Sequence, residues 1–137
     1  MSFGTAYKPP EATNTILSEF VVERSRLNPD AGIIYVNKDF VRSMMTPQQK
    51  EFSKRYPNIF LSNNLPLIKL LANNKTIALV SHGGQNQFIE AMEAQVPILI
   101  VPGVVFDHHM YCKYVHHRQY GFCMDDITTY KITRAIA

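Results

Sequence analysis

The feature that most constrains the fold of this chain is a series of short, mostly apolar segments separated by stretches with helical spacing. The segments read GIIYV, NIFLS, TIALV and VPILIVP. Strands that are buried on both faces have this continuous apolar character, and helices between consecutive strands make those strands parallel. The sequence therefore predicts an α/β fold in which a parallel sheet is covered by helices on both faces.

Apolar spacing and turn signals place the individual elements. Strands are expected at residues 32–36, 58–62, 75–81, 96–102 and 121–124. Helices are expected at residues 15–27, 65–71, 88–94 and 107–119, with a short one between residues 37 and 57. A last helix is expected at residues 130–137, capped by Thr128 or Thr129.

Length and charge limit the classes of protein to which the chain can belong. A length of 137 residues fits one domain, and 46% hydrophobic with 18% charged residues is a globular composition. The net charge of +3 is not gathered into Lys/Arg clusters, which argues against nucleic-acid binding. No apolar run approaches the roughly 20 residues of a membrane span, and no signal peptide is recognisable.

Both ends of the chain read as interrupted elements. The segment SFGT resembles a strand that leads into a phosphate-type turn, yet only Met1 precedes it, and the last helical pattern stops at Ala137. We expect residues 1–137 to be a single domain that is incomplete at both ends and belongs to a larger protein.

The two cysteines, Cys112 and Cys123, are too few for a disulfide framework, and their spacing matches no redox motif. We expect both to be structural thiols, which fits a reducing compartment. His109, Cys112 and His116 would share a helix face and could ligate zinc. No closed set of ligands with supporting residues accompanies them, so no metal site is expected.

The motif with the clearest chemistry is SHGGQNQFIEA at residues 81–91, directly after an apolar strand. Ligands of open parallel sheets bind beyond the carboxyl ends of the strands. The helix expected to begin at about Gln85 has unpaired N–H groups and a partial positive charge in its first turn. Gly83 and Gly84 let the backbone approach a bound group, so the motif predicts a phosphate or diphosphate site.

The polar residues of the motif extend this prediction. His82 can add a hydrogen-bond donor and Asn86 an amide, whereas Glu90 would repel a phosphate and suits the hydroxyls of a ribose. The alternative is that Gly-Gly forms only a tight turn after a strand. Nucleophilic catalysis by Ser81 with His82 is not expected, because adjacent residues at a strand end point in opposite directions.

The longer pattern, His-Gly-Gly-x-Asn-x-x-x-Glu-Ala followed by Val-Pro and a second apolar strand, resembles the donor-binding signature of the UDP-glycosyltransferases. This family includes glucuronosyl- and glucosyltransferases. The likeness is strongest over residues 77–121, and the flanks SFGT, NIFLSNNLPLIKLL and GFCMDDITTYKITRAI occur in the matching order. The resemblance implies a Rossmann-like domain, namely the C-terminal, nucleotide-sugar-binding half of a GT-B fold. It also implies an inverting, metal-independent reaction in which a UDP-sugar is the donor substrate and no cofactor is needed.

The resemblance implies a role for each matching residue. The diphosphate would be held by His82, Gly83, Gly84 and Asn86, with Gly4 and Thr5 close to it. The ribose hydroxyls would meet Glu90, the sugar hydroxyls would meet Asp107 and His108, and the uracil would be covered by Leu65.

Several positions depart from the family pattern. Asn64-Leu65-Pro66-Leu67 stands where Trp-x-Pro-Gln is common, Gln95 stands in place of a glycine, and Tyr111 stands in place of an asparagine. The chain has no tryptophan, and the loss of an aromatic platform for the base costs roughly 1–3 kcal/mol. The segment between Pro102 and Asp107 is one residue longer than usual.

The implied function is transfer of a hexosyl group from a UDP-sugar to an acceptor hydroxyl. The family's general base is a histidine of the N-terminal half, so no catalytic residue is assigned here, and an acceptor-binding domain in cis or in a partner chain is needed. Two alternatives stay open: the donor-binding subunit of a two-chain transferase, and a degenerate, non-catalytic nucleotide-binding or interaction module. Sugar, acceptor and compartment, whether cytosol or endoplasmic reticulum membrane, stay open as well.

Overall fold

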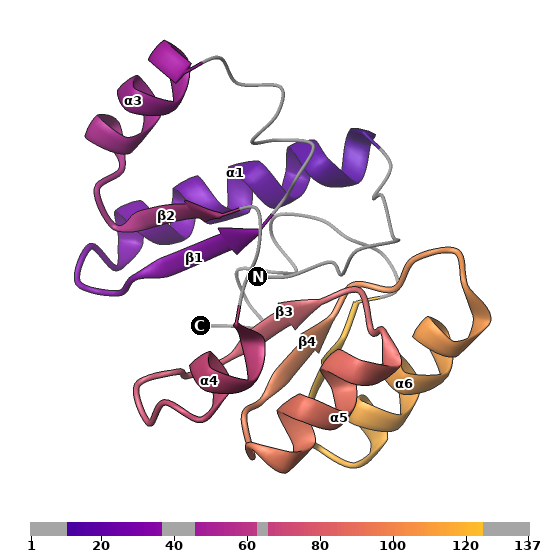
Figure 1. Ribbon diagram of the computed structural model, residues 1–137. Coiled ribbons are helices and arrows are strands. Elements are labelled where there is room, and N and C mark those ends of the chain that lie inside the picture. The colour runs from indigo at the N-terminus through magenta and orange to yellow at the C-terminus, as the bar shows by residue number, and fades with distance from the viewer. Residues whose placement is uncertain (1–10, 37–45, 63–65, 125–137) are drawn as a thin grey trace.

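The computed structural model describes residues 11–36, 46–62 and 66–124, which form alternating helices and strands (Figure 1). The helices are α1 (Glu11–Leu27), α3 (Thr46–Arg55), α4 (Leu67–Leu71), α5 (Gln85–Glu93) and α6 (Phe106–His117). The strands are β1 (Ile33–Val36), β2 (Ile59–Ser62), β3 (Leu79–Ser81), β4 (Ile98–Ile100) and β5 (Gly121–Cys123). The predicted α/β order is therefore confirmed, whereas the helix expected at 130–137, with its cap at Thr128 or Thr129, lies outside the described residues.

All strand pairs of the described residues are parallel, as the apolar segments predict. β1 pairs with β2 in a two-stranded sheet, and β3, β4 and β5 form a three-stranded sheet in that order. The register places Leu79 beside Ile98 and Ser81 beside Ile100. Because the strands are parallel, β3 and β4 end at the same edge of the sheet, and the helices that follow them both begin there.

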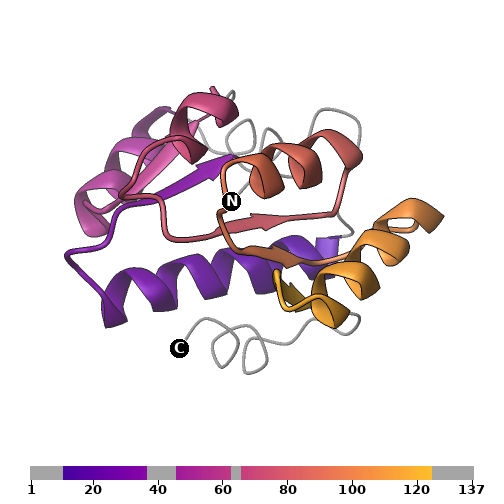
Figure 2. The ribbon, with the colours of Figure 1, turned by 90° about the horizontal axis from the view of Figure 1, so that it is seen from below.

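The three-stranded sheet has a buried face on each side, which explains why its strands are apolar throughout. On one face, Val80, Leu99 and Val101 pack with α1 residues such as Leu17 and Val21. On the other face, strand residues pack against α4, α5 and α6; these are Leu79, Ile98 and Ile100, which meet Leu71, Ala91, Cys112 and Val115. The sheet therefore lies between α1 and α5 (Figure 2), and the predicted helix cover on both faces is confirmed.

β3 is shorter than the predicted strand at 75–81. The preceding residues turn back on α4, since the Thr76 hydroxyl donates to the Leu70 carbonyl over 2.5 Å. Ile77 is 75% exposed, so this apolar residue stands outside the core. An apolar run thus marks the position of the strand but not its first residue.

The prediction of two structural thiols is wrong, because Cys112 and Cys123 form a disulfide. The chain reverses after α6 and returns as β5, which brings the two Cα atoms to 4.7 Å. The bond ties α6 to the strand that follows it. It also rules out the zinc set of His109, Cys112 and His116, because the sulfur of Cys112 is already bonded.

No helix among residues 11–36, 46–62 and 66–124 is long and apolar enough to cross a membrane.

Candidate functional site

The turn between β3 and α5 lies at the carboxyl edge of the sheet. Gly84 is the N-cap residue of α5 and has extended backbone angles. The first helical backbone bond of α5 runs from the Phe88 amide to the Gly84 carbonyl over 3.0 Å. The amides of Gln85 and Asn86 precede that bond, and both residues are exposed. The helix therefore begins at Gln85, as predicted, and its positive end faces solvent.

A buried hydrogen-bond pair that sequence reasoning missed holds this turn in place. The Ser81 hydroxyl donates to the Gln87 side-chain oxygen over 2.5 Å. The Ser81 oxygen also accepts the Gly83 amide at 3.2 Å. Since the Gly83 amide points inward to Ser81, it is turned away from a ligand, whereas the amides of the first turn of α5 remain available. The spacing of six residues between serine and glutamine carries no periodic signal, so the bond shows only in three dimensions.

The packing of the protein requires glycine at position 83 and leaves little room for a Cβ at position 84. Gly83 has a φ of +89°, and an added Cβ would stand 2.8 Å from a methyl group of Ile100 and 3.3 Å from the His108 carbonyl. At Gly84, an added Cβ would stand 2.7 Å from Nε2 of His82. The pair therefore makes room for β4, for the start of α6 and for an imidazole, in addition to leaving the backbone open to a ligand.

The structure brings His82 and His108 into contact. Their ring centroids are 4.6 Å apart and the planes are nearly perpendicular, at 82°. The two side chains are only 7% and 6% exposed. Burial lowers the pKa of His82 to about 4, His108 lowers it further, and the carboxylate of Asp107 opposes both effects. Burial also lowers the pKa of His108, against the raising effect of Asp107, and His109 lowers it further.

Both imidazoles are consequently neutral at pH 7 in the unliganded protein. A neutral imidazole offers one N–H donor and one acceptor nitrogen. The site can therefore donate a hydrogen bond to an anion without carrying a fixed positive charge.

Three more of the predicted residues lie on the two helices that begin at this edge of the sheet. Asn86 is exposed and Glu90 is partly exposed. They are four residues apart and so share a face of α5. Asp107 lies in the first turn of α6 and is partly exposed. Gly4, Thr5 and Leu65 lie outside the described residues.

Two of the departures from the family pattern have structural roles. Gln95 has a φ of +57°, which explains why glycine is usual at its position. Tyr111 stacks on Phe88 with ring centroids 4.5 Å apart, so it joins α6 to α5. The Ser81 hydroxyl is engaged with Gln87, which agrees with the expectation that Ser81 and His82 form no nucleophilic pair. Within the described ranges, no group of three His, Cys, Asp or Glu residues could hold a metal ion.

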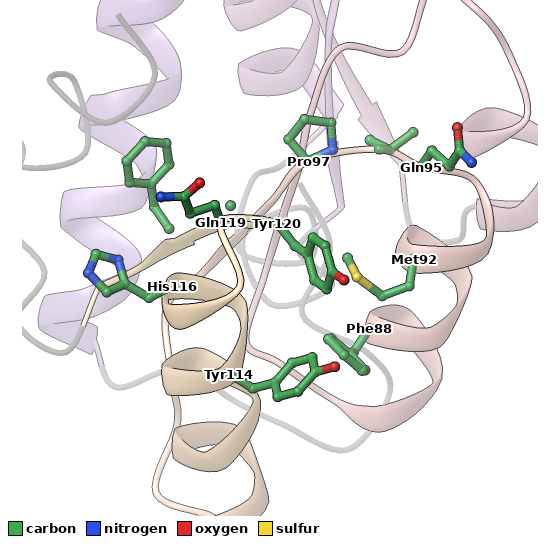
Figure 3. A pocket seen from close by; sticks show the side chains of 11 residues that line it. Phe88, Met92, Gln95, Pro97, Tyr114, His116, Gln119 and Tyr120 are labelled. Atoms are coloured by element: carbon green, nitrogen blue, oxygen red, sulfur yellow. The ribbon is translucent and has the colours of Figure 1, made fainter.

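A cavity of about 1210 Å³ lies at the other end of α5 and α6 (Figure 3). Its walls are mainly aromatic and aliphatic, and they include Phe88, Met92, Pro97, Tyr114, Tyr120 and Phe122. The rings of Phe88 and Tyr114 meet edge to face at 5.9 Å. The carbonyl ends of both helices are directed to this region, and they repel anions. The cavity is therefore separate from the predicted diphosphate site and unsuited to its ligand.

No family model matches the chain. Among the curated proteins, a Caenorhabditis elegans protein named UDP-glucuronosyltransferase ugt-56 is 27% identical over 113 residues, which are 82% of this chain and 20% of that protein. A Caenorhabditis briggsae protein named UDP-glucuronosyltransferase ugt-47 is 29% identical over 76 residues, or 56% of this chain and 14% of that protein. The chain thus spans a fifth or less of the length of these relatives.

Solved structures give a more complete match to the fold. Os79 from O. sativa in complex with UDP superposes with a TM-score of 0.77 at 20% identity, covering 98% of this chain and 30% of that one. A UDP-glucose:anthocyanidin 3-O-glucosyltransferase in complex with UDP gives a TM-score of 0.76 at 17% identity, covering 98% and 29%. At this level of identity the likeness establishes the fold, which is the Rossmann-like C-terminal half of a GT-B fold. Sequence relatives and fold neighbours point to one family, and the resemblance is confirmed: the chain is similar to the C-terminal domain of the UDP-glycosyltransferases.

Proposed function

We propose that this chain is the UDP-sugar-binding domain of a glycosyltransferase that transfers a hexosyl group to an acceptor hydroxyl. One observation carries the proposal: His82, Gly83 and Gly84 form the turn into the first turn of α5, in a fold whose solved neighbours include UDP complexes. The chain covers only about a third of the neighbouring structures. The proposed reaction as a whole therefore involves parts of the enzyme outside this chain.

The diphosphate is assigned to the first turn of α5. The amides of Gln85 and Asn86 supply donors at the positive end of the helix, and a phosphate at such an end is stabilised by both effects. His82 supplies a further donor from beside Gly84. During transfer, negative charge develops on the leaving diphosphate, and these preorganised donors stabilise it without a metal ion.

The ribose and the transferred sugar of the donor are assigned to residues farther along α5 and at the start of α6. Glu90 lies one turn beyond Asn86, where its carboxylate can accept hydrogen bonds from ribose hydroxyls and stays away from the phosphates. Asp107 and His108, at the start of α6, are proposed to meet the transferred sugar. Gly4 and Thr5 at the diphosphate and Leu65 at the uracil remain predictions from the family resemblance.

Catalysis requires a base that removes the proton of the acceptor hydroxyl. We assign no such base to this chain, and we propose that an acceptor-binding domain supplies it, either in cis or as a partner chain. The two-chain form is tested by mixing the 137-residue chain with a candidate acceptor domain and measuring transfer from a UDP-sugar.

Calorimetry with UDP and with inorganic diphosphate tests the binding site. We expect Glu90→Ala to weaken UDP binding about 10–100-fold, as expected for loss of a hydrogen bond to a charged group, and to leave diphosphate binding nearly unchanged. His82→Ala should weaken both ligands. Lys113→Ala, an exposed substitution on the outer part of α6, serves as the control and should change neither.

Two results would count against these assignments. Equal losses for UDP and diphosphate in Glu90→Ala would show that Glu90 does not touch the ribose. No heat at millimolar UDP, with the chain folded by circular dichroism, would favour the non-catalytic module instead.

A further inference from the structure

We propose that His82 and His108 act as one imidazole pair that stays neutral in the empty site and takes up a single proton when a diphosphate binds. His108 is then a positioning residue, which keeps His82 neutral until the anion arrives. This inference rests on the proposed function, because it concerns the same diphosphate site.

The geometry places the pair where a bound anion acts on it. His82 lies so close over Gly84 that a Cβ there would meet its Nε2 at 2.7 Å, and Gly84 is the cap of α5. The backbone of His108 borders the neighbouring residue, Gly83. One ring therefore stands at the positive end of the helix and the other stands directly behind it, at a centroid distance of 4.6 Å.

When no ligand is bound, burial and mutual proximity keep both rings of the pair uncharged. Both rings are more than nine-tenths buried, and burial penalises their charged forms. Each ring also opposes protonation of the other, because two positive charges at this separation repel. The pair can therefore accept one proton far more readily than two.

A bound diphosphate makes protonation of one ring of the pair favourable. An opposite charge within about 4–6 Å raises a histidine pKa by roughly 1–3, and a diphosphate diester brings two such charges. This rise suffices to carry His82 from about 4 into the range of neutral pH. The second ring stays neutral, because the first proton now repels another.

Few other charged groups bear on the pair. Among the described residues these are Asp107, which favours protonation of both rings, and His109, which disfavours it at His108. Both residues lie on α6, beside His108. Asp107 thus adds to the effect of the ligand, whereas His109 opposes it.

Proton uptake is measured by calorimetry of UDP-glucose in two buffers of different ionisation enthalpy. UDP-glucose is the suitable probe because its diphosphate is esterified at both ends and so has no group that titrates near neutral pH. At pH 6.5 we expect uptake of about 0.5–1 proton, and an affinity that rises about fivefold between pH 7.5 and pH 6. Uridine, which lacks the diphosphate, should bind without uptake.

Variants separate the pair from other titrating groups. His82→Gln should remove most of the uptake, whereas His117→Gln, an exposed histidine at the far end of α6, should retain it. His108→Gln should shift the uptake to higher pH, because the ring that opposes protonation of His82 is gone. An unchanged pH profile in His108→Gln would overturn the coupling.

The wild-type titration decides the inference even if a variant does not fold. Binding of UDP-glucose with less than about 0.1 proton taken up at pH 6.5 would overturn the imidazole pair and leave the proposed function intact. Absence of binding for both UDP and UDP-glucose would overturn the proposed function together with the pair.

Discussion

Helices α5 and α6 begin at one edge of the sheet and end at the other. Both edges contain left-handed backbone positions, but different residue types occupy them. At the carboxyl edge, where α5 begins, the left-handed position is taken by Gly83. At the amino edge, where α5 and α6 end, the left-handed positions are taken by Gln95 and Gln119, with φ of 57° and 60°. Glycine thus takes the left-handed position at one edge, and glutamine takes it at the other.

Available space accounts for this difference. An added Cβ at Gly83 would press on Ile100 and on the His108 backbone, whereas the side chains of Gln95 and Gln119 line the open cavity of Figure 3. A positive φ alone costs an L residue about 1–2 kcal/mol, which a folded protein can tolerate. A positive φ without room for a Cβ leaves glycine as the residue that fits.

Polarity separates the two edges in the same way. The carboxyl edge buries two contacting pairs of polar side chains, Ser81 with Gln87 and His82 with His108. The amino edge has aromatic walls and a cavity of about 1210 Å³, yet it receives the negative ends of two helices. The chemistry of a nucleotide therefore favours the carboxyl edge.

The largest effect is expected from Gly83→Ala, which tests whether space matters at the carboxyl edge. Backbone strain of about 1–2 kcal/mol and overpacking of about 1–3 kcal/mol should together lower the free energy of unfolding by about 2–5 kcal/mol. Urea denaturation measures this loss, and UDP binding should weaken with it because the turn must shift.

Gly32→Ala is the matched control for this substitution. A Cβ at Gly32 would meet Phe60 at an ordinary 3.5 Å, and Gly32 has no positive φ. We expect a change of less than about 1 kcal/mol. A similarly small loss in Gly83→Ala would show that Ile100 and α6 give way, and the contrast between the two edges would fail.

The next effect concerns the histidines of the two edges. The pKa of His82 in the folded protein, about 4, lies below the usual value of 6.5, so the unfolded chain binds more protons between these values. The contribution of neutral His82 to stability is therefore complete above pH 6.5 and falls as the pH drops toward 4. Between pH 7 and pH 5 the free energy of unfolding should fall by about 1–2 kcal/mol on account of this group.

Urea denaturation at both pH values tests this dependence without any ligand. His82→Gln should remove the part of the pH dependence of the free energy of unfolding that comes from His82. His117→Gln, at the exposed end of α6, should leave this pH dependence unchanged. A slope that survives His82→Gln would assign the acid sensitivity to other groups.

The order of the elements and the position of the turn were predictable from the sequence, because apolar runs and glycines are local signals. The apolar runs placed all five strands of the described residues, and SHGGQN placed the start of α5 at Gln85. Contacts between distant residues gave no such signal. The Ser81–Gln87 bond, the meeting of His82 with a residue of α6 and the Cys112–Cys123 disulfide all depend on how β4 and β5 bring the helices together.

The family pattern also showed where glycine was missing, but only the backbone explains what its absence means. In the sequence, Gln95 departs from the family pattern at a position where glycine is usual. In the structure, its amide donates to the Met92 carbonyl at 3.1 Å, and the next amide, of Val96, donates to the Ala91 carbonyl at 3.0 Å. These two bonds form a Schellman motif, the helix ending that usually has glycine at the left-handed position. Glutamine forms it here at the cost of backbone strain. The substitution therefore affects stability at the amino edge and leaves the diphosphate turn untouched.

The smallest effect is expected from Gln95→Gly, which restores the favoured residue at the amino edge. Relief of the left-handed strain, less the extra freedom of glycine in the unfolded chain, should raise the free energy of unfolding by about 0.5–1 kcal/mol. Gln95→Ala keeps a Cβ and should bring no gain, which separates backbone strain from loss of the glutamine side chain. UDP affinity should be equal in all three proteins, since this turn lies at the opposite end of α5 from Gly84. Equal stability of the glycine and alanine variants would mean that the position is unstrained, and that space alone distinguishes the two edges.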